Sequence, residues 1–468
     1  MESFFYPNSI VIFGASSNEI KSGNHVLRNI LNFRKTNIYL IHPTKEKIYN
    51  IDCYKKIFNI PTKIIDLAII ILPVDLVLDA LENCIEFGVK SIIVESGALF
   101  LRNSQEEQSK ARISNIKEQI KLKDIKIMGP NSIGVYNAYK NQPSFVTSLI
   151  YFDKLPALKR KNVSIIAQTG LTLSGLLLYH NYIQEFGIAK IASIGNKFDV
   201  NESDMLDFLE NDPNTDVIAL YLEDIKEGKR FLDQCKRIIK KKPIILLKSG
   251  KTEKGKKAIM SHTQSLAGDY KIIKSLSKQL GIIIVDDFNE MFQVAKILLN
   301  QPFPKGTNIG LISISGAGTV LSSDLSERYH LNLPDLDSNQ REELKEIFPN
   351  FAWDDIYNPL DIWASVEQVG PEKAYQRAGE ILLNKGNLNF LIYYLTAIRE
   401  TEFNWEILKE FNEKYPETII IIGFFGGDKR LILQWREILE EKLNIPTFQS
   451  ISEMFRVISK LESKNIKK

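Results

Sequence analysis

Residues 10–33 read IVIFGASSNEIKSGNHVLRNILNF and decide how the first part of the chain is expected to fold. A run of apolar residues at 10–13 leads into the small-residue turn 14–17, and an amphipathic stretch follows at 26–33. A strand that is apolar at consecutive positions is typical of a sheet covered on both faces. The order strand, tight turn and helix therefore predicts a parallel α/β unit built from crossover connections.

The same pattern repeats along the chain and predicts three α/β units. The expected strands are 10–13, 38–41, 67–72, 92–94 and 125–128, then 163–167, 188–194, 217–222, 243–247 and 282–285, then 309–313, 388–394 and 418–422. Residues 140–161 have no clear period and indicate a crossover, while QPFPKG at 301–306 is typical of a linker. We therefore expect domains at 1–150, 151–303 and 304–468.

The composition is that of an ordinary globular protein. The 468 residues are 44% hydrophobic and 25% charged, with 60 Lys and Arg against 57 Asp and Glu, a net charge of +3. Such a balance argues against a nucleic-acid partner but leaves room for a local basic cleft. Three distant cysteines predict neither a disulfide framework nor a zinc site. The start lacks a signal-peptide pattern and the apolar runs are too short to span a membrane, so we expect a cytoplasmic protein.

The turn at 14–17 is a candidate site for a phosphate-bearing ligand, because a helix that starts after a tight turn presents backbone N–H groups to an anion. A dinucleotide fold would place an acid about 20 residues after the glycines, but the second strand ends in His42-Pro43-Thr44-Lys45. This counts against NAD and offers Lys45 to a ribose phosphate. NADP fits the same observation, and an isolated turn without a ligand is an equal alternative.

His262 is the candidate for covalent chemistry. It lies in the stretch KSGKTEKGKKAIMSHTQSLAG at 248–268, where small polar residues make a core position improbable. An unprotonated imidazole can accept a phosphoryl group and release it again. The alternative is an exposed loop histidine without a role.

A phosphohistidine needs its anion stabilised and its ring held in one orientation. Gln168, Thr169 and Gly170 follow the expected strand 163–167 and are candidates for binding the phosphoryl group. Glu223 follows the expected strand 217–222 at the same sheet edge, where its carboxylate could accept the other ring N–H. The alternative for Glu223 is a surface acid that starts a turn.

Together these motifs resemble the NDP-forming acyl-CoA synthetase family, in particular the α subunits of its ADP-forming acetate–CoA ligases and of succinyl-CoA synthetase. The strings that carry the resemblance occur in the order of the family and cover almost the whole chain: IFGAS (12–16), GPNSIG (129–134), QTG (168–170), SIGNKFDV (193–200), YLEDI (221–225), SHTQSLAG (261–268), SISGAG (313–318) and NPLD (358–361).

The resemblance implies a fold and a reaction. The fold would be a Rossmann-like CoA-binding domain followed by two flavodoxin-like domains. Acyl-CoA and phosphate would give acyl phosphate and CoA, and the phosphoryl group would pass to His262, steadied by Glu223, and then to ADP. The resemblance also implies contacts to CoA from a set of residues spread over several strand ends: Gly14, Ala15, Ser16, Lys21, Lys45, Pro73 and Asn131.

The resemblance further implies a partner. The three units account for the whole chain, so ATP or ADP and Mg²⁺ would be bound by a separate ATP-grasp β-type subunit, and the chain would act as an acid–CoA ligase only with it. A small organic acid is the expected substrate, with neither nucleic acid nor membrane as a partner. Ser132 and Gln264 depart from the family's usual Cys and Gly. The alternatives are a non-catalytic CoA- or acyl-CoA-binding regulatory protein and, resting on the first turn alone, an NADP-dependent oxidoreductase.

Overall fold

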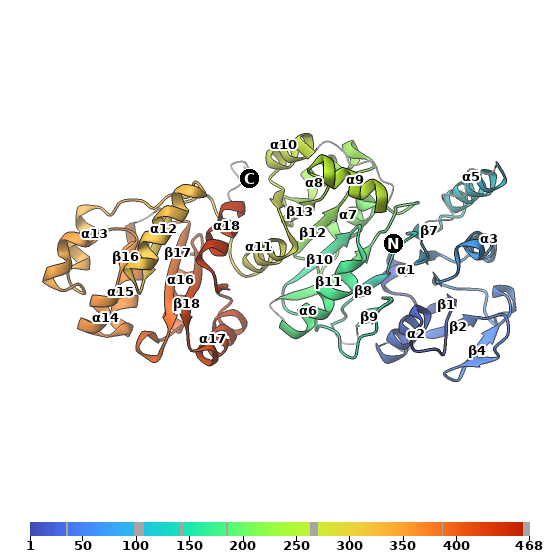
Figure 1. The fold of residues 1–468 in the computed structure, drawn as a ribbon, viewed down its shortest axis with the longest axis horizontal. Helices are drawn as coiled ribbons and strands as arrows, with labels where there is room; N and C mark the ends of the chain where they lie inside the picture. The colour runs from blue at the N-terminus through green and yellow to red at the C-terminus, as the bar shows by residue number, and fades with distance from the viewer. Residues whose placement is uncertain are drawn as a thin grey trace. The chain divides into compact units, whose positions relative to one another are not determined.

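The chain divides into two compact units, Met1–Asp286 and Asp287–Lys468. The computed structural model describes residues 1–33, 36–97, 107–140, 144–183, 186–262, 270–385 and 387–461. Within these residues the first unit contains two seven-stranded sheets and the second a five-stranded sheet (Figure 1). Each unit is therefore described separately.

The first sheet has the strand order β3-β4-β2-β1-β5-β6-β7. Its strands are β1 (Ser9–Phe13), β2 (Asn37–Ile41), β3 (Lys47–Ile48), β4 (Ile51–Tyr54), β5 (Leu67–Ile70), β6 (Ser91–Val94) and β7 (Lys126–Met128), and its helices are α1 (Glu2–Phe5), α2 (Ser22–Phe33), α3 (Val77–Phe87) and α5 (Glu107–Leu122), with short turns η1 (Ile57–Asn59) and η2 (Val74–Leu76). The five expected strands are confirmed, and all pair in parallel. The antiparallel hairpin β3–β4 was not expected, because it has only two and four residues.

The second sheet has the order β14-β13-β12-β10-β11-β8-β9. Its strands are β8 (Val135–Asn137), β9 (Phe145–Val146), β10 (Asn162–Ala167), β11 (Gly187–Ser193), β12 (Val217–Leu222), β13 (Ile244–Lys248) and β14 (Ile283–Val285), and its helices are η4 (Gly170–Leu173), α6 (Gly175–Ile183), α7 (Glu202–Glu210), α8 (Gly228–Ile238), α9 (Glu253–His262) and α10 (Tyr270–Leu280). The five expected strands are parallel, whereas β8 and β9 are antiparallel. The stretch expected to be only a crossover thus contributes an edge strand, too short to show a period.

A shared apolar core joins the two sheets of the first unit. One continuous cluster contains Ile12 and Ile93 of the first sheet together with Val135 and Ile166 of the second. The ring of Phe5 in α1 also stacks on Phe208 in α7, with 5.1 Å between centroids. Because apolar surface from both sheets is buried in the same cluster, their carboxyl ends are held in a defined relation.

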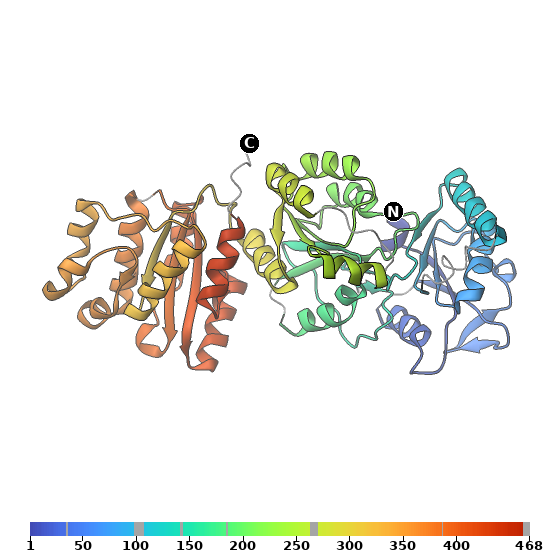
Figure 2. The ribbon, with the colours of Figure 1, turned by 45° about the horizontal axis from the view of Figure 1, so that its top comes forward.

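The second unit is built on the parallel sheet β16-β15-β17-β18-β19, with helices flanking both of its faces (Figure 2). Its elements are α11 (Phe288–Asn300), β15 (Ile309–Ser313), α12 (Gly316–Arg328), α13 (Ser338–Leu344), η5 (Asn350–Asp355), β16 (Leu360–Asp361), α14 (Trp363–Val369), α15 (Pro371–Lys385), β17 (Phe390–Ala397), η6 (Arg399–Thr401), α16 (Glu406–Lys414), β18 (Ile419–Gly427), α17 (Lys429–Arg436), η7 (Glu437–Lys442), β19 (Thr447–Phe448) and α18 (Ile451–Leu461). The helix α11 precedes the expected linker, yet its buried Glu290 contacts Arg456 and Lys460 of α18.

Candidate functional site

The turn after β1 is packed so closely that it admits no side chain. Gly14 has φ +91°, and a Cβ built on it would lie 2.0 Å from the carbonyl oxygen of Ile71. A Cβ on Gly23, at the start of α2, would lie 2.0 Å from the oxygen of Gly14. Ala15 is buried behind the turn. The sequence therefore forms the tight strand-to-helix turn that leaves backbone N–H groups accessible to an anion.

Positive charge gathers at this turn. The ammonium of Lys45, in the loop after β2, donates to the hydroxyl of Ser17 at 2.5 Å. The hydroxyl of Ser16 accepts from the backbone N–H of Asn18 at 3.1 Å, and Lys21 immediately precedes α2. The structure thus brings the predicted contacts from 14 to 45 into one place. A lysine beside a helix start fits the phosphate groups of CoA.

Ser96 ties together the two remaining predicted CoA contacts. Its hydroxyl donates to the carbonyl of Leu72 at 2.7 Å and accepts from the N–H of the same residue at 2.9 Å, next to Pro73. The carbonyl of Ser96 accepts from the N–H of Asn131 at 2.9 Å. Pro73 and Asn131 therefore lie at neighbouring strand ends, on the carboxyl edge where ligands bind in open α/β sheets.

The loop 129–134 rests on the turn that follows β11. The carbonyl of Pro130 accepts from the N–H of Asn196 at 2.9 Å, and the hydroxyl of Ser132 donates to the carbonyl of Ser193 at 2.6 Å. A Cβ on Gly195 would lie 2.2 Å from the oxygen of Pro130. The predicted CoA loop is thus in direct backbone contact with the second sheet's carboxyl edge.

Gln168 organises that edge through both ends of its amide. Its Oε1 accepts from the backbone N–H of Glu223 at 2.7 Å and of Asp224 at 3.1 Å. Its Nε2 donates to the carboxylate of Asp224 at 2.6 Å. The structure therefore brings Gln168 and Glu223 together as expected of one sheet edge, and it shows that the Gln168 side chain is occupied by the protein.

A buried lysine supports the same arrangement. The Lys197 ammonium, 1% exposed, lies 2.9 Å from the Glu202 carboxylate and 2.5 Å from that of Asp224. The sequence analysis assigned no role to Lys197 or Asp224. Lys197 lies four residues after β11 and Asp224 two residues after β12, and such positions predict polar residues near a strand end but give no partner.

Thr169 and Gly170 begin a short helical turn rather than a full helix. The Thr169 hydroxyl accepts from the N–H of Leu171 at 3.2 Å and caps η4, and α6 starts only at Gly175. The helical segment after Thr169 is therefore interrupted after one turn. A Cβ on Gly170 would lie 3.0 Å from Ile133, so this turn faces the loop 129–134.

Glu223 is a buried acid rather than a surface residue. It is 5% exposed, and the hydroxyl of Tyr221 is hydrogen-bonded to its carboxylate. Burial raises the pKa of Tyr221, and the neighbouring Glu223 charge raises it further. The alternative of a solvent-exposed turn acid is therefore wrong, and the carboxylate occupies the sheet edge where Gln168 and Asp224 meet.

His262 is the last residue of α9, the helix that follows β13. Its ring, and residues 263–269 including Gln264, lie outside the described part of the structure. The expected pairing of His262 with Glu223 therefore stays a prediction. His262 lies on the helix that follows β13, and β13 is paired in parallel with β12, the strand that precedes Glu223; this order is compatible with the pairing.

Glu95 is a further acid at the carboxyl edge of the first sheet, and no role was predicted for it. It follows β6 and is buried, and neither carboxylate oxygen has a hydrogen-bond partner among the described residues. A Cβ on Gly134 would lie 3.0 Å from its Oε1. Burial raises its pKa well above the ordinary value, because a buried carboxylate loses its hydration.

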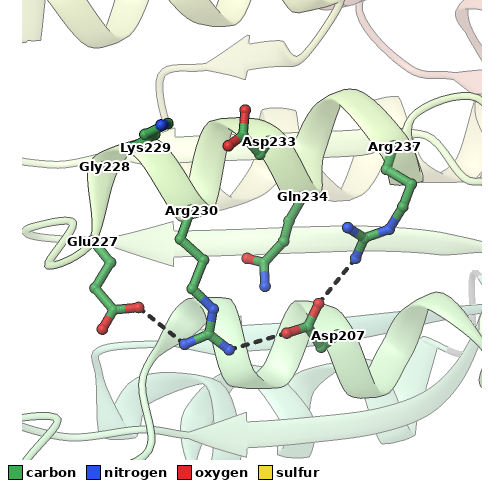
Figure 3. Close-up of a pocket in the computed structure, with 8 residues that line it drawn as sticks. All are labelled: Asp207, Glu227, Gly228, Lys229, Arg230, Asp233, Gln234 and Arg237. Atoms are coloured by element: carbon green, nitrogen blue, oxygen red, sulfur yellow. Dashed lines mark hydrogen bonds and ion pairs between the residues drawn. The ribbon is translucent and has the colours of Figure 1, made fainter.

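A surface groove of about 700 Å³ lies between α7 and α8, apart from these residues. It is lined by Asp207, Glu227, Gly228, Lys229, Arg230, Asp233, Gln234 and Arg237. Figure 3 shows both arginines turned towards acids, Arg230 contacting Glu227 and Asp207, and Arg237 contacting Asp207. Because both arginines are already paired with acids, they offer little to an anion in this groove. The predicted site residues are not among those that line it.

Comparisons with known proteins agree with this geometry. Residues 8–138 match the CoA binding domain family, and residues 160–298 match the succinyl-CoA ligase like flavodoxin domain family. The chain is 30% identical over 458 residues to the α subunit of acetate–CoA ligase (ADP-forming) II of Pyrococcus furiosus, covering 96% of this chain and 94% of that subunit.

Two further relatives extend over nearly all of the chain. Acetate–CoA ligase (ADP-forming) II of Archaeoglobus fulgidus is 32% identical over 464 residues, and the chain spans 66% of its length. The acetyl-coenzyme A synthetase 1 of Ca. Korarchaeum cryptofilum, solved with phosphate and ADP, matches with a TM-score of 0.81 and 27% identity, covering 99% of this chain and 96% of that one.

The fold and the two domain matches thus define a chain with a CoA-binding domain and a succinyl-CoA ligase-like flavodoxin domain. The chain belongs to the ADP-forming acetate–CoA ligase family, in which it corresponds to the α subunit. In the part of the chain that the structure describes, no helix has the length and apolar character needed to cross a membrane.

Proposed function

We propose that this chain is the α-type subunit of an ADP-forming acid–CoA ligase that acts on acetate or another short acid. The observation that carries the proposal is the contact between the loop 129–134 and the edge formed by Gln168, Gly170 and Glu223. It supports the proposal because the predicted CoA loop and the predicted phosphate-binding residues are neighbours, as transfer from a thioester to phosphate requires. The family and the two CoA-ligase domain matches support the same activity.

In the proposed reaction a phosphate oxygen attacks the thioester carbonyl, the C–S bond breaks, and acyl phosphate and CoA result. The ring nitrogen of His262 then attacks phosphorus, and the acid leaves as its carboxylate. An oxygen of ADP finally takes the phosphoryl group as the P–N bond breaks. Splitting one difficult step into several easier ones is the general gain of a covalent intermediate.

The chain's own residues have distinct roles in this proposal. Gly14, Ala15, Ser16, Lys21, Lys45, Pro73 and Asn131 bind CoA. Thr169 and Gly170 offer backbone N–H groups to the phosphoryl group, while the Gln168 side chain holds the Glu223 loop. The carboxylate of Glu223 accepts the N–H of the His262 ring and keeps the other nitrogen nucleophilic.

A separate ATP-grasp β-type subunit is part of the proposal, as the supplier of the ATP or ADP and Mg²⁺ site. Its support is that the Pyrococcus furiosus relatives matched over most of their length are named α subunits. The division into domains at 1–150, 151–303 and 304–468 also stays a prediction, as does a cytoplasmic location.

The experiment that tests the proposed function is intact mass of the chain, purified with its native partner, after incubation with acetyl-CoA and inorganic phosphate. We expect an acid-labile phosphoryl group on the wild type and on His330→Asn, and none on His262→Asn. His330 is a matched control because it is exposed and has φ +56°, which asparagine accepts.

Either of two results would contradict the proposal: an unmodified wild-type chain, or a phosphoryl group that persists in His262→Asn. The alternative function, a non-catalytic CoA-binding regulator, predicts CoA binding without any phosphoryl group on the chain. Co-purification of an ATP-grasp protein, checked in the same sample by mass, tests the partner.

A further inference from the structure

Four lysines of the described residues are about 1% exposed, and Lys248 differs from the other three in the partners of its ammonium. Three have a carboxylate within hydrogen-bond distance: Lys190 contacts Asp212, Lys197 contacts Glu202, and Lys296 contacts Glu440. The ammonium of Lys248 instead donates to two backbone carbonyl oxygens. A buried charge is costly unless its partners are well placed, so the Lys248 ammonium depends on these two carbonyl oxygens.

The acceptors of Lys248 belong to the candidate site. Its Nζ lies 2.5 Å from the carbonyl oxygen of Glu223 and 2.6 Å from that of Ser249. Lys248 is the last residue of β13 and pairs in register with Leu222, the last residue of β12. The side chain therefore reaches sideways across the sheet edge to the residue that follows the neighbouring strand.

Glu223 is therefore hydrogen-bonded at its backbone N–H, at its backbone C=O and at its carboxylate. Its N–H donates to Gln168 at 2.7 Å, its C=O accepts from Lys248 at 2.5 Å, and its carboxylate is bonded to Tyr221. Gln168 and Lys248 are both buried and lie on opposite neighbours of β12. The Glu223 backbone is therefore fixed from both neighbouring strands, and the Tyr221 hydrogen bond limits the directions that its carboxylate can take.

We propose that Lys248 is a positioning residue for phosphoryl transfer: its ammonium fixes the Glu223 carbonyl, and thereby the direction of the Glu223 carboxylate towards the His262 ring. The inference rests on the roles of Glu223 and His262 in the proposed function. It extends that function to a residue whose contacts are wholly within the protein.

The charge of Lys248 has a second effect at this edge. A hydrogen bond from a charged donor is roughly twice as strong as one between neutral groups, which suits a contact that must resist thermal motion.

The proposal predicts a pH dependence, because burial lowers the pKa of Lys248 to about 8. The charged groups that face it are Asp224 and Glu223, which raise its pKa, and Lys197 and Lys251, which lower it. Below that pH the ammonium clamps the carbonyl with full strength, and above it the weaker neutral amine remains. Phosphorylation of His262 should therefore decline on the alkaline side with an apparent pKa near 8.

The experiment measures single-turnover formation of acid-labile phosphate on the native complex. The complex is mixed with acetyl-CoA and inorganic phosphate at pH values from about 6 to about 10. We expect Lys248→Met to lower the rate roughly 10- to 100-fold, as removal of an orienting hydrogen bond does elsewhere, with CoA affinity unchanged and no decline near pH 8. Lys248→Arg keeps a charge at every pH tested and should move the decline upward.

Lys190→Met is the matched control, because it removes an equally buried lysine from the same sheet while leaving Glu223 untouched. It should lower stability but keep the decline near pH 8. A wild-type rate for Lys248→Met, or the same alkaline decline in that variant, overturns the inference. This comparison of Lys248→Met with the wild type is sufficient even if the Lys248→Arg variant does not fold. Absence of phosphate on the wild type would instead overturn the proposed function itself, and the inference with it.

Discussion

Gln168 shows how one side chain can order a sheet edge. Its amide oxygen accepts two backbone N–H groups, and its amide nitrogen donates to Asp224, which in turn meets Lys197. Both polar atoms of this buried amide are therefore hydrogen-bonded. A fully satisfied polar network of this kind rigidifies the loop that presents Glu223.

Glu95 gives a prediction at the residue scale, because its buried carboxyl has no described partner and a raised pKa. The folded chain keeps the Glu95 proton above about pH 4.3, where the unfolded chain loses it. Unfolding free energy should therefore fall by about 1.4 kcal/mol per pH unit from this group as pH rises. Glu95→Gln removes that slope and should be the more stable protein at pH 7.

Urea unfolding of the wild type and Glu95→Gln at several pH values checks this expectation. The two stability curves should converge near pH 4 and separate as the pH rises. Asp75→Asn is a suitable control, since this acid lies in the exposed turn η2 of the same sheet. Parallel curves for wild type and Glu95→Gln would show that Glu95 is not protonated in the folded chain.

At the scale of elements, the carboxyl ends of the strands decide where the chemistry lies. The expected strands of the first two sheets are confirmed as elements, because long apolar runs fold into covered parallel strands in almost any context. Whether the residues after them meet is a matter of strand order. The order β13-β12-β10 places Lys248, Glu223 and Gln168 on three adjacent strands, although they lie far apart in the sequence.

The connection between α6 and β11 carries a prediction on acid stability. The Nε2–H of His180 donates to the carbonyl of Phe186 at 2.7 Å, and the two rings lie 4.4 Å apart. Burial lowers the pKa of His180 to about 4, so the histidine is neutral in the folded chain. Between pH 6.5 and about 4 only the unfolded chain takes up this proton, and stability should be lost over that window.

His180→Gln tests this window, because an amide nitrogen can still donate to Phe186 but cannot titrate. The shift corresponds to about 3 kcal/mol, which the wild type should lose between pH 6.5 and 4 relative to the variant. Chemical denaturation at both ends of the window measures it. His330→Asn, at an exposed position whose left-handed backbone asparagine accepts, should follow the wild-type curve.

At the scale of the whole molecule, the first two sheets act as one unit. Their shared core contains Val135 and Ile194 beside Ile12 and Ile93, so separating them would expose a large apolar surface. The expected boundary near 150 therefore falls within a compact unit, whereas contacts divide the chain between Asp286 and Asp287.

This organisation predicts the behaviour of fragments. Residues 1–286 should fold cooperatively and bind CoA with the affinity of the complete chain, because the predicted CoA contacts and the core beneath them lie within that unit. Residues 1–150 alone should aggregate or stay partly unfolded. Calorimetric titration with CoA and thermal unfolding of the two fragments measure this. A well-folded 1–150 fragment with full CoA affinity would contradict it.

Much of this protein was determined by the sequence alone. Apolar runs, small-residue turns and their order were enough to predict three parallel α/β units. The ordered series of motifs from 12–16 to 358–361 was enough to predict the family, and the position of Glu223 after its strand made it a candidate residue. These features are local, so a pattern of a few residues carries them.

Only the tertiary structure decided which side chains meet and how they are charged. The clamp of Glu223 between Gln168 and Lys248, the raised pKa of the buried Glu95, and the edge strands β8 and β9 all depend on residues brought together from distant parts of the chain. Burial sets the pKa values of Lys248 and Glu95, and burial is a property of the packed molecule rather than of any stretch of sequence.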